Sequence, residues 1–126
     1  MKKPFSAHIE RDTINNMNYR KVVYTAKHMQ LVLMRLRPKE EIGAEVHPDT
    51  DQFFRFESGE GVVVIDGSKY LVKNGSAIVV PCGSKHNVIN TSTTRHLMLY
   101  TIYAPPEHKD GVVQKRKQDP EVKPRK

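Results

Sequence analysis

The chain has 126 residues, 37% hydrophobic and 28% charged, which is enough for one domain and excludes a second independent core. No stretch approaches the roughly 20 consecutive apolar residues that cross a bilayer, and no apolar run follows the basic start, so we expect neither a membrane span nor a signal peptide. Cys82 is the single cysteine, which rules out an internal disulfide and fits a cytoplasmic location.

An N-terminal arm, residues 1–20, is polar and weakly patterned and ends in a turn or a short helical end at residues 15–18. From residue 21 to residue 108, short segments rich in β-branched and aromatic residues alternate with turn formers. Turn signals recur about every 8–12 residues, a spacing typical of an all-β sandwich or barrel. The expected strands are residues 22–24, 30–36, 53–57, 62–65, 69–72, 77–80, 86–89 and 97–103.

The net charge of +7 is concentrated in a C-terminal segment, residues 109–126. This segment holds seven basic and three acidic residues, a net charge of +4, which leaves +3 for the other 108 residues. It contains no aromatic residue that would stack on bases and no nucleic-acid-binding motif. We therefore expect a basic, flexible tail and no specific nucleic-acid partner.

Four polar residues in the middle of the chain have the spacing of a metal site. Glu45 and His47 are two residues apart, so in an extended segment they project to the same side. The turn formers of residues 48–51 then reverse the chain, which lets Gln52 face the same centre. His86 comes 34 residues after Gln52, and a closed β fold is required to bring it back to the other three.

The residues around these four resemble the two sequence motifs of the cupin superfamily, between residues 43 and 90. The first motif, G-x5-H-x-H-x3-4-E-x6-G, is matched in spacing from its first ligand to Gly59, with Glu45 in place of the usual first histidine and Gln52 in place of the usual glutamate. The resemblance implies a small antiparallel jelly-roll barrel over residues 21–108, with one metal ion near its mouth. The second motif, G-x5-P-x-G-x2-H-x3-N, is matched in full by Gly75, Pro81, Gly83, His86 and Asn90.

The two replacements preserve the charge of the implied ligand set. The usual three imidazoles and one carboxylate carry −1, and here Glu45 supplies the same −1 while Gln52 and the two histidines are neutral. Two oxygen and two nitrogen donors suit Mn²⁺, Fe²⁺, Co²⁺ or Ni²⁺, and they suit Cu(I) poorly. We expect one divalent ion and favour Mn²⁺ because the set is rich in oxygen, although Zn²⁺ would also bind.

A substrate pocket is expected between the metal and the inward side chains of the barrel. Phe54 shares the phase of Gln52 and is predicted to point inward. On the last long strand two phases are open, and we favour His96, Met98 and Tyr100 as inward residues because they give an apolar pocket polar groups. The alternative is that Met98 and Tyr100 only fill the core.

Two classes of function fit these features. One is an enzyme that acts on a small oxygen-bearing molecule, similar to cupin sugar isomerases or dioxygenases. The other is a non-catalytic module that binds or senses a metal or small molecule. A phosphorylated sugar is weakly supported, because Lys85 is the one basic residue close to the second motif. Cupins commonly pair through N-terminal strands, which implies a homodimer formed through residues 20–36.

Overall fold

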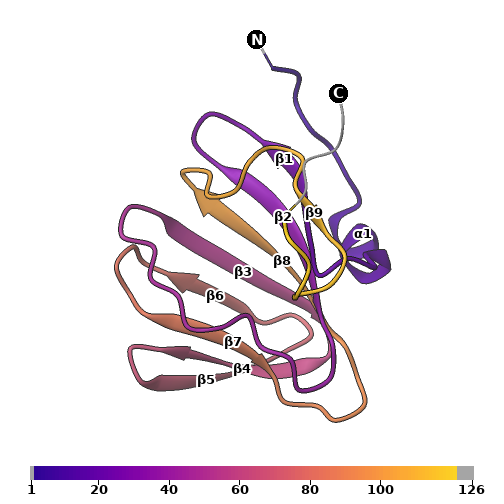
Figure 1. Cartoon of the computed structure of the whole chain (residues 1–126), viewed down its shortest axis with the longest axis vertical. Coiled ribbons are helices and arrows are strands. Elements are labelled where there is room, and N and C mark those ends of the chain that lie inside the picture. Colours follow the sequence, from indigo (N-terminus) through magenta and orange to yellow (C-terminus); the bar gives the residue numbers. More distant parts are fainter. Residues whose placement is uncertain (1, 122–126) are drawn as a thin grey trace.

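The computed structural model describes residues 2–121 and shows a protein of short antiparallel strands preceded by one short helix (Figure 1). The predicted strands are all present, and their bounds differ from the predicted ones by at most two residues. The elements are α1 (Ile9–Asn15), β1 (Arg20–Thr25), β2 (Gln30–Leu36), β3 (Asp51–Ser58), β4 (Glu60–Ile65), β5 (Ser68–Lys73), β6 (Ala77–Val80), β7 (His86–Asn90), β8 (Leu97–Ala104) and β9 (Val113–Gln114).

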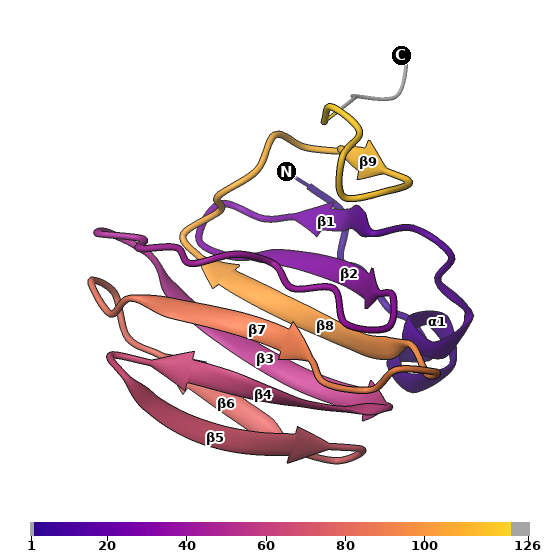
Figure 2. The same cartoon turned by 60° about the horizontal axis from the view of Figure 1, so that its bottom comes forward.

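The strands form two sheets that face each other (Figure 2). The larger sheet has the order β6-β3-β8-β2-β1-β9 and the smaller sheet the order β5-β4-β7, with every pairing antiparallel. Sequential neighbours such as β3 and β4 lie in different sheets, so the chain passes from one layer to the other. This arrangement confirms the predicted all-β jelly-roll fold.

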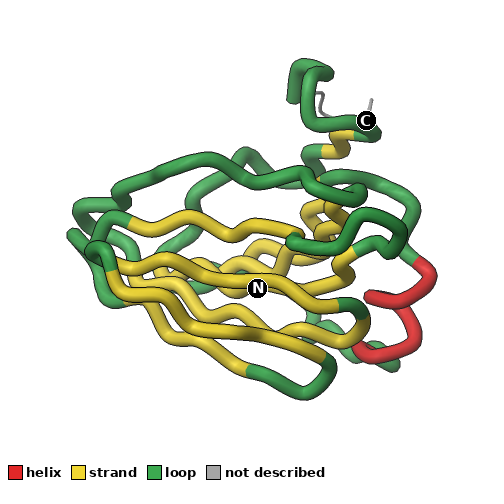
Figure 3. The backbone as a smooth tube through the Cα atoms, turned by 90° about the horizontal axis from the view of Figure 1, so that it is seen from below, coloured by secondary structure: helices red, strands yellow, loops and turns green. Residues whose placement is uncertain are grey.

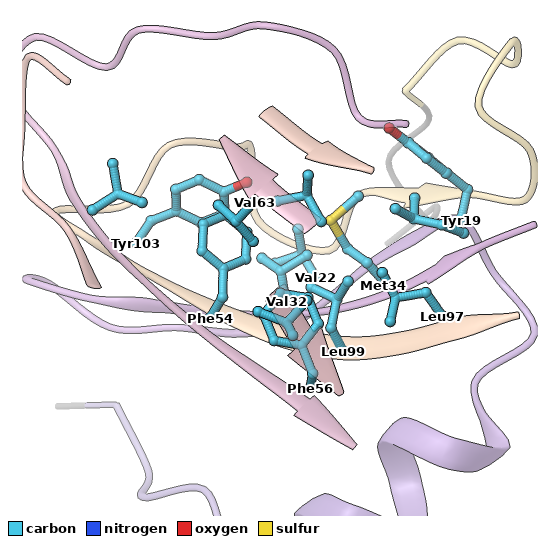
Figure 4. Packing of buried hydrophobic residues seen from close by; sticks show 14 of the residues in the cluster. Tyr19, Val22, Val32, Met34, Phe54, Phe56, Val63, Leu97, Leu99 and Tyr103 are labelled. Carbon is cyan, nitrogen blue, oxygen red and sulfur yellow. The ribbon is translucent and has the colours of Figure 1, made fainter. Parts of the chain in front are cut away.

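The hydrophobic core lies between the two sheets and is built by alternate residues of each strand (Figure 4). On β3 the buried set includes Gln52, Phe54 and Phe56, which is the predicted phase. Burial of these rings removes apolar surface from water at about 25 cal/mol per Å², which makes the inter-sheet core the main stabilising feature of the fold. On β8 the buried residues are Leu97, Leu99, Thr101 and Tyr103.

The prediction that His96, Met98 and Tyr100 point into the barrel is therefore wrong. All three are only partly buried and alternate with the inward residues of β8. The outward residues of β8, which include Met98, Tyr100 and Ile102, are also apolar or aromatic. Helix α1 contacts β8 and β3 at one end of the stacked strands (Figure 3). A strand that is covered on both faces has no polar phase, so its sequence does not reveal which residues point inward. His96 instead accepts a hydrogen bond from Arg35 Nε at 2.8 Å.

The passage from β3 to β4 depends on a bulge and a glycine. The register of β3 against β8 shifts between Phe56 and Ser58, and the intervening Glu57 is buried. Gly59 follows with φ of +93°, and a Cβ there would lie 2.4 Å from the carbonyl oxygen of His96. Glycine is therefore required where the chain leaves the larger sheet.

The C-terminal segment is docked on the barrel as far as the structure describes it. Strand β9 pairs with β1 through Gln114 opposite Arg20, and Val112 is 2% exposed and belongs to the core. The prediction of a flexible tail is wrong for the described part of this segment. Its basic composition gives no sign that Val113 and Gln114 pair with β1 or that Val112 packs in the core. Residues 122–126, which were predicted to continue the tail, lie outside the described residues.

No helix of the described chain is long and apolar enough to cross a membrane.

Candidate metal centre

The segment between β2 and β3 carries Glu45 and His47 to the mouth of the barrel. It was expected to be extended, and it forms isolated bridges to β7 without becoming a regular strand. Glu45 and His86 exchange backbone hydrogen bonds of 2.8 and 2.9 Å, which fixes these two residues side by side. The N–H of Gly83 donates to the carbonyl oxygen of His47 at 2.8 Å. The turn before His86 therefore holds the segment in place.

Glu45, His47 and His86 form a cluster with metal-ligand spacing. One ligand atom from each lies within 4.8 Å of the others, and His47 Nε2 is 3.8 Å from Glu45 Oε1. The two imidazole rings have centroids 5.4 Å apart and are tilted by 49°. A single ion with bonds of about 2 Å to each residue fits this cluster after small side-chain rotations.

Gln52 lies on β3 opposite Tyr103 of β8, whose ring contacts His47, and its amide oxygen has no hydrogen-bond partner within residues 2–121. Its Nε2 donates to Thr101 Oγ1 at 2.9 Å, and the hydroxyl of Thr101 in turn donates to the carbonyl oxygen of Phe53 at 2.8 Å. The hydroxyl of Thr101 has one proton, which it donates to the carbonyl oxygen of Phe53. The same hydroxyl therefore acts as the acceptor toward Gln52, and this hydrogen bond orients the Gln52 amide. The Oε1 atom is thus the end of the side chain that remains available for a ligand.

Three buried polar atoms at this mouth have no hydrogen-bond partner within residues 2–121. They are His47 Nε2, Gln52 Oε1 and His86 Nε2. Leaving a buried polar atom unpaired costs about 1–3 kcal/mol, and four more such atoms lie elsewhere in residues 2–121, on Thr13, Arg20, Arg55 and Glu57. The two histidine nitrogens differ from these because they lie in one cluster with the Glu45 carboxylate. Two imidazole nitrogens and a carboxylate are donors that a divalent cation takes, and Glu45, His47 and His86 therefore fit a metal ion.

The surroundings of the two histidines orient their rings. The Nδ1 atom of His86 lies 3.0 Å from the carbonyl oxygen of Ser84, an acceptor that places the ring proton on Nδ1 and leaves Nε2 as the metal-binding nitrogen. Phe54 packs its ring against His86 with centroids 6.1 Å apart, and Tyr103 presents an edge to His47 at 5.8 Å. Phe54 and Tyr103 lie together at one end of the core in Figure 4.

A polar layer that sequence reasoning missed covers this mouth. Tyr103 is buried, and burial raises the pKa of its phenol, which stays protonated and bonds His108 Nε2 at 3.3 Å. Burial, and then the charge of Arg20, lowers the pKa of His108, and its Nδ1 donates to Glu121 at 2.7 Å. No local pattern marks these residues, because Tyr103 is at the end of β8, His108 is in the loop that follows, and Glu121 is in the segment expected to be a tail.

The sequence and the fold of this chain are similar to those of known proteins. Residues 32–103 match the family model described as Cupin domain. The Bacillus subtilis protein YrkC is 49% identical over 123 residues, which are 93% of this chain and 66% of that protein. A protein of Acanthamoeba polyphaga mimivirus is 40% identical over 116 residues, covering 90% of this chain and 72% of that protein.

A solved structure shares the fold closely. The crystal structure of BH2720 from Bacillus halodurans is 40% identical to this chain and superposes with a TM-score of 0.89 over 91% of both chains. The TT1209 protein of Thermus thermophilus, at 25% identity, gives a TM-score of 0.70 over 79% of this chain. The matched region of the family model includes Glu45, His47, Gln52 and His86.

Proposed function

This chain belongs to the cupin family, and from its candidate metal centre we propose that it binds one divalent ion through Glu45, His47, Gln52 and His86. In this proposal the ion keeps open positions for a small molecule with oxygen donors, which enters at the mouth of the barrel. When bound, such an ion supplies a Lewis acid that polarises a carbonyl or hydroxyl group of the molecule.

The observation that carries the proposal is the cluster of Glu45, His47 and His86, together with the unpaired buried atoms of the proposed ligands. His47 Nε2, Gln52 Oε1 and His86 Nε2 come from three separate segments and, within the described chain, are each without a protein partner. A β barrel that only needed to be stable would have apolar side chains at these positions, because apolar burial has no such cost. Retention of polar atoms there indicates a ligand that pairs with all of them.

The donor set favours Mn²⁺ over softer ions. One carboxylate and one amide oxygen accompany two imidazole nitrogens, and the carboxylate gives the set a charge of −1. Oxygen donors favour hard to borderline ions, so we propose Mn²⁺ as the preferred ion, with Fe²⁺, Co²⁺, Ni²⁺ and Zn²⁺ as competitors. The high intrinsic affinity of nickel and zinc makes the ion found after purification depend on which metals are available.

The side chains around the site set the character of the bound molecule. Phe54 and Tyr103 pack their rings against the two histidines, so the proposed ion has aromatic side chains on its inner side. We propose a small, oxygen-bearing molecule that chelates the ion, with chemistry similar to a sugar isomerase or a dioxygenase. A non-catalytic binding role is the second candidate. It is favoured by Tyr103, because burial raises the pKa of its phenol and so keeps it protonated and unavailable as a general base.

A metal titration tests the site. Metal-free protein is titrated with Mn²⁺, and binding is followed by the loss of the free-ion electron paramagnetic resonance signal. We expect one ion per chain, and the His86→Ala variant should lose at least about 100-fold in affinity, since removal of a ligand costs several kcal/mol. His96→Ala is the matched control, because His96 is partly exposed and bonds Arg35. Equal affinity of the two variants would remove the basis for the proposal.

The type of function is tested on the metal-loaded protein. Oxygen consumption and aldose–ketose conversion are measured with panels of small hydroxy and keto compounds. Turnover that disappears in His86→Ala supports an enzyme, whereas tight binding of a compound without turnover supports a binding module. The homodimer through residues 20–36 and the cytoplasmic location stay predictions.

A further inference from the structure

The ring of His47 has a second carboxylate neighbour on the side away from the metal cluster. Glu107 Oε1 lies 3.5 Å from His47 Nδ1, whereas Glu45 Oε1 lies 3.8 Å from His47 Nε2. The two carboxylates therefore face different nitrogens of one imidazole. Glu107 is not among the residues whose ligand atoms lie within 4.8 Å of one another. Its carboxylate therefore lies beside the Nδ1 side of the His47 ring and not beside the proposed ion.

Glu107 is placed by a buried amide on β2. The side chain of Gln30 is completely buried, and its Oε1 accepts the backbone N–H groups of Glu107 at 3.2 Å and of His108 at 2.9 Å. Its Nε2 donates to the carbonyl oxygen of His108 at 2.7 Å and to Thr25 Oγ1 at 3.0 Å. Both ends of the amide are paired, so Gln30 fixes the backbone that carries the Glu107 side chain.

The residues after Glu107 are tied down as well. His108 contacts Tyr103 and Glu121, and β9 adds to the edge of β1. The Gln114 side chain donates to the carbonyl oxygens of Lys117 and Asp119 at 2.9 and 2.8 Å, and it accepts from Arg20 at 2.7 Å. Glu107 is therefore the point at which a docked C-terminal segment reaches the metal cluster.

A histidine that binds a metal through Nε2 carries its proton on Nδ1 and needs an acceptor there. A carboxylate in this position fixes the tautomer and the ring orientation and increases the basicity of the binding nitrogen. His86 has the carbonyl oxygen of Ser84 in this role. For His47, Glu107 is the group that the structure places at Nδ1.

We propose that Glu107 is a positioning residue for the metal ligand His47 and that it makes metal affinity depend on the docked C-terminal segment. The inference rests on the proposed metal site and adds to it a residue that lies outside the two sequence motifs. Because the carboxylate is held through Gln30, loss of the docking weakens metal binding even when the four ligands are intact. In turn, bound metal stabilises the docked segment by the same factor.

The test compares Glu107→Ala, Glu107→Gln and Asp110→Asn in otherwise intact protein. Asp110 is an exposed acidic residue of the same segment, so its variant removes a carboxylate charge without touching His47. Mn²⁺ affinity is measured by competition with a chelator, and the fold of each metal-free variant is checked by thermal unfolding. We expect Glu107→Ala to bind about 10–100-fold more weakly, Glu107→Gln to lose less because its amide oxygen accepts a hydrogen bond, and Asp110→Asn to match the wild type.

A spectroscopic measurement separates positioning from general stabilisation. In protein loaded with Zn²⁺ as a diamagnetic probe, the ¹⁵N resonances of His47 should show the proton on Nδ1, and the Nδ1–H signal should shift in Glu107→Ala while the His86 signals stay in place. Wild-type affinity in Glu107→Ala, or an equal loss in Asp110→Asn, would overturn this inference alone. Wild-type protein that binds no divalent ion would instead remove the proposed function.

Discussion

The two ends of strand β7 place buried polar side chains in contrasting surroundings. Asn90 at one end is completely buried, and its Nδ2 donates to the carbonyl oxygens of Leu36, Arg37 and Arg95 at 2.8–3.2 Å. Its Oδ1 accepts the N–H of Ser92 at 3.0 Å. His86 at the other end has Nδ1 paired with Ser84 but Nε2 unpaired among the residues that the structure describes.

This difference separates structural from functional polar residues within one motif. Asn90 and His86 belong to the same run of residues 75–90, and both face the interior. The saturated side chain of Asn90 joins the end of β2 to the loop between β7 and β8, so its role is to hold this end of the barrel together. The unsaturated nitrogen of His86 has no such use in the fold, which is why it points to a ligand.

The largest expected effect is loss of stability at the Asn90 end. Asn90→Leu leaves three carbonyl oxygens without their donor, and we expect the free energy of unfolding to fall by roughly 2–4 kcal/mol. Chemical denaturation of the metal-free protein measures the change. Mn²⁺ affinity of the folded variant should equal that of the wild type, and a coupled loss of metal binding would contradict the separation of the two ends.

A smaller effect of opposite sign is expected at the mouth. Gln52→Leu removes a buried unpaired oxygen and replaces an amide by an apolar group, so the metal-free variant should be as stable as the wild type or about 1 kcal/mol more stable. Its Mn²⁺ affinity should fall by about tenfold or more, because one oxygen donor is lost. Destabilisation of more than 2 kcal/mol would show that Gln52 serves the fold.

The smallest effect concerns pH and the polar layer over the mouth. Burial, followed by the charge of Arg20, lowers the pKa of His108 below its ordinary value of 6.5. The unfolded chain therefore binds more protons, so the stabilisation by neutral His108 is present above pH 6.5 and is lost as the pH falls below it. Thermal unfolding of metal-free protein between pH 7.5 and 5.5 should show a steeper loss for the wild type than for His108→Gln. An equal loss of stability with falling pH in the two proteins would show that burial does not keep His108 neutral.

The sequence predicted most of this architecture where polar and apolar residues alternate. On β3 the charged residues Asp51 and Arg55 lie in the phase opposite to Phe54 and Phe56, which reveals the buried face. The motif spacing nominated Glu45, His47 and His86, which the fold brings together, and Gln52, which stays a prediction as a fourth ligand. On β8 both faces are apolar, so periodicity carries no information about the inward phase.

Two further residues near the site, Glu107 and His108, could not be predicted from the sequence for a different reason. Glu107 and His108 reach the mouth through contacts with Gln30, which is more than 70 positions earlier in the chain. Such pairing leaves no local pattern, and the basic composition of the following segment is typical of a solvated tail. The two-residue strand β9 is also too short to produce a periodic signal.

Anomalous diffraction from crystals grown with Mn²⁺ shows directly whether these residues hold one ion. We expect one anomalous peak at the mouth of the barrel, within bonding distance of the Glu45 carboxylate, His47 Nε2, Gln52 Oε1 and His86 Nε2. The His86→Ala variant, crystallised under the same conditions, should lose this peak. A peak at any other position, or an ordered structure in Mn²⁺ with no peak among these four residues, would contradict the proposed metal site.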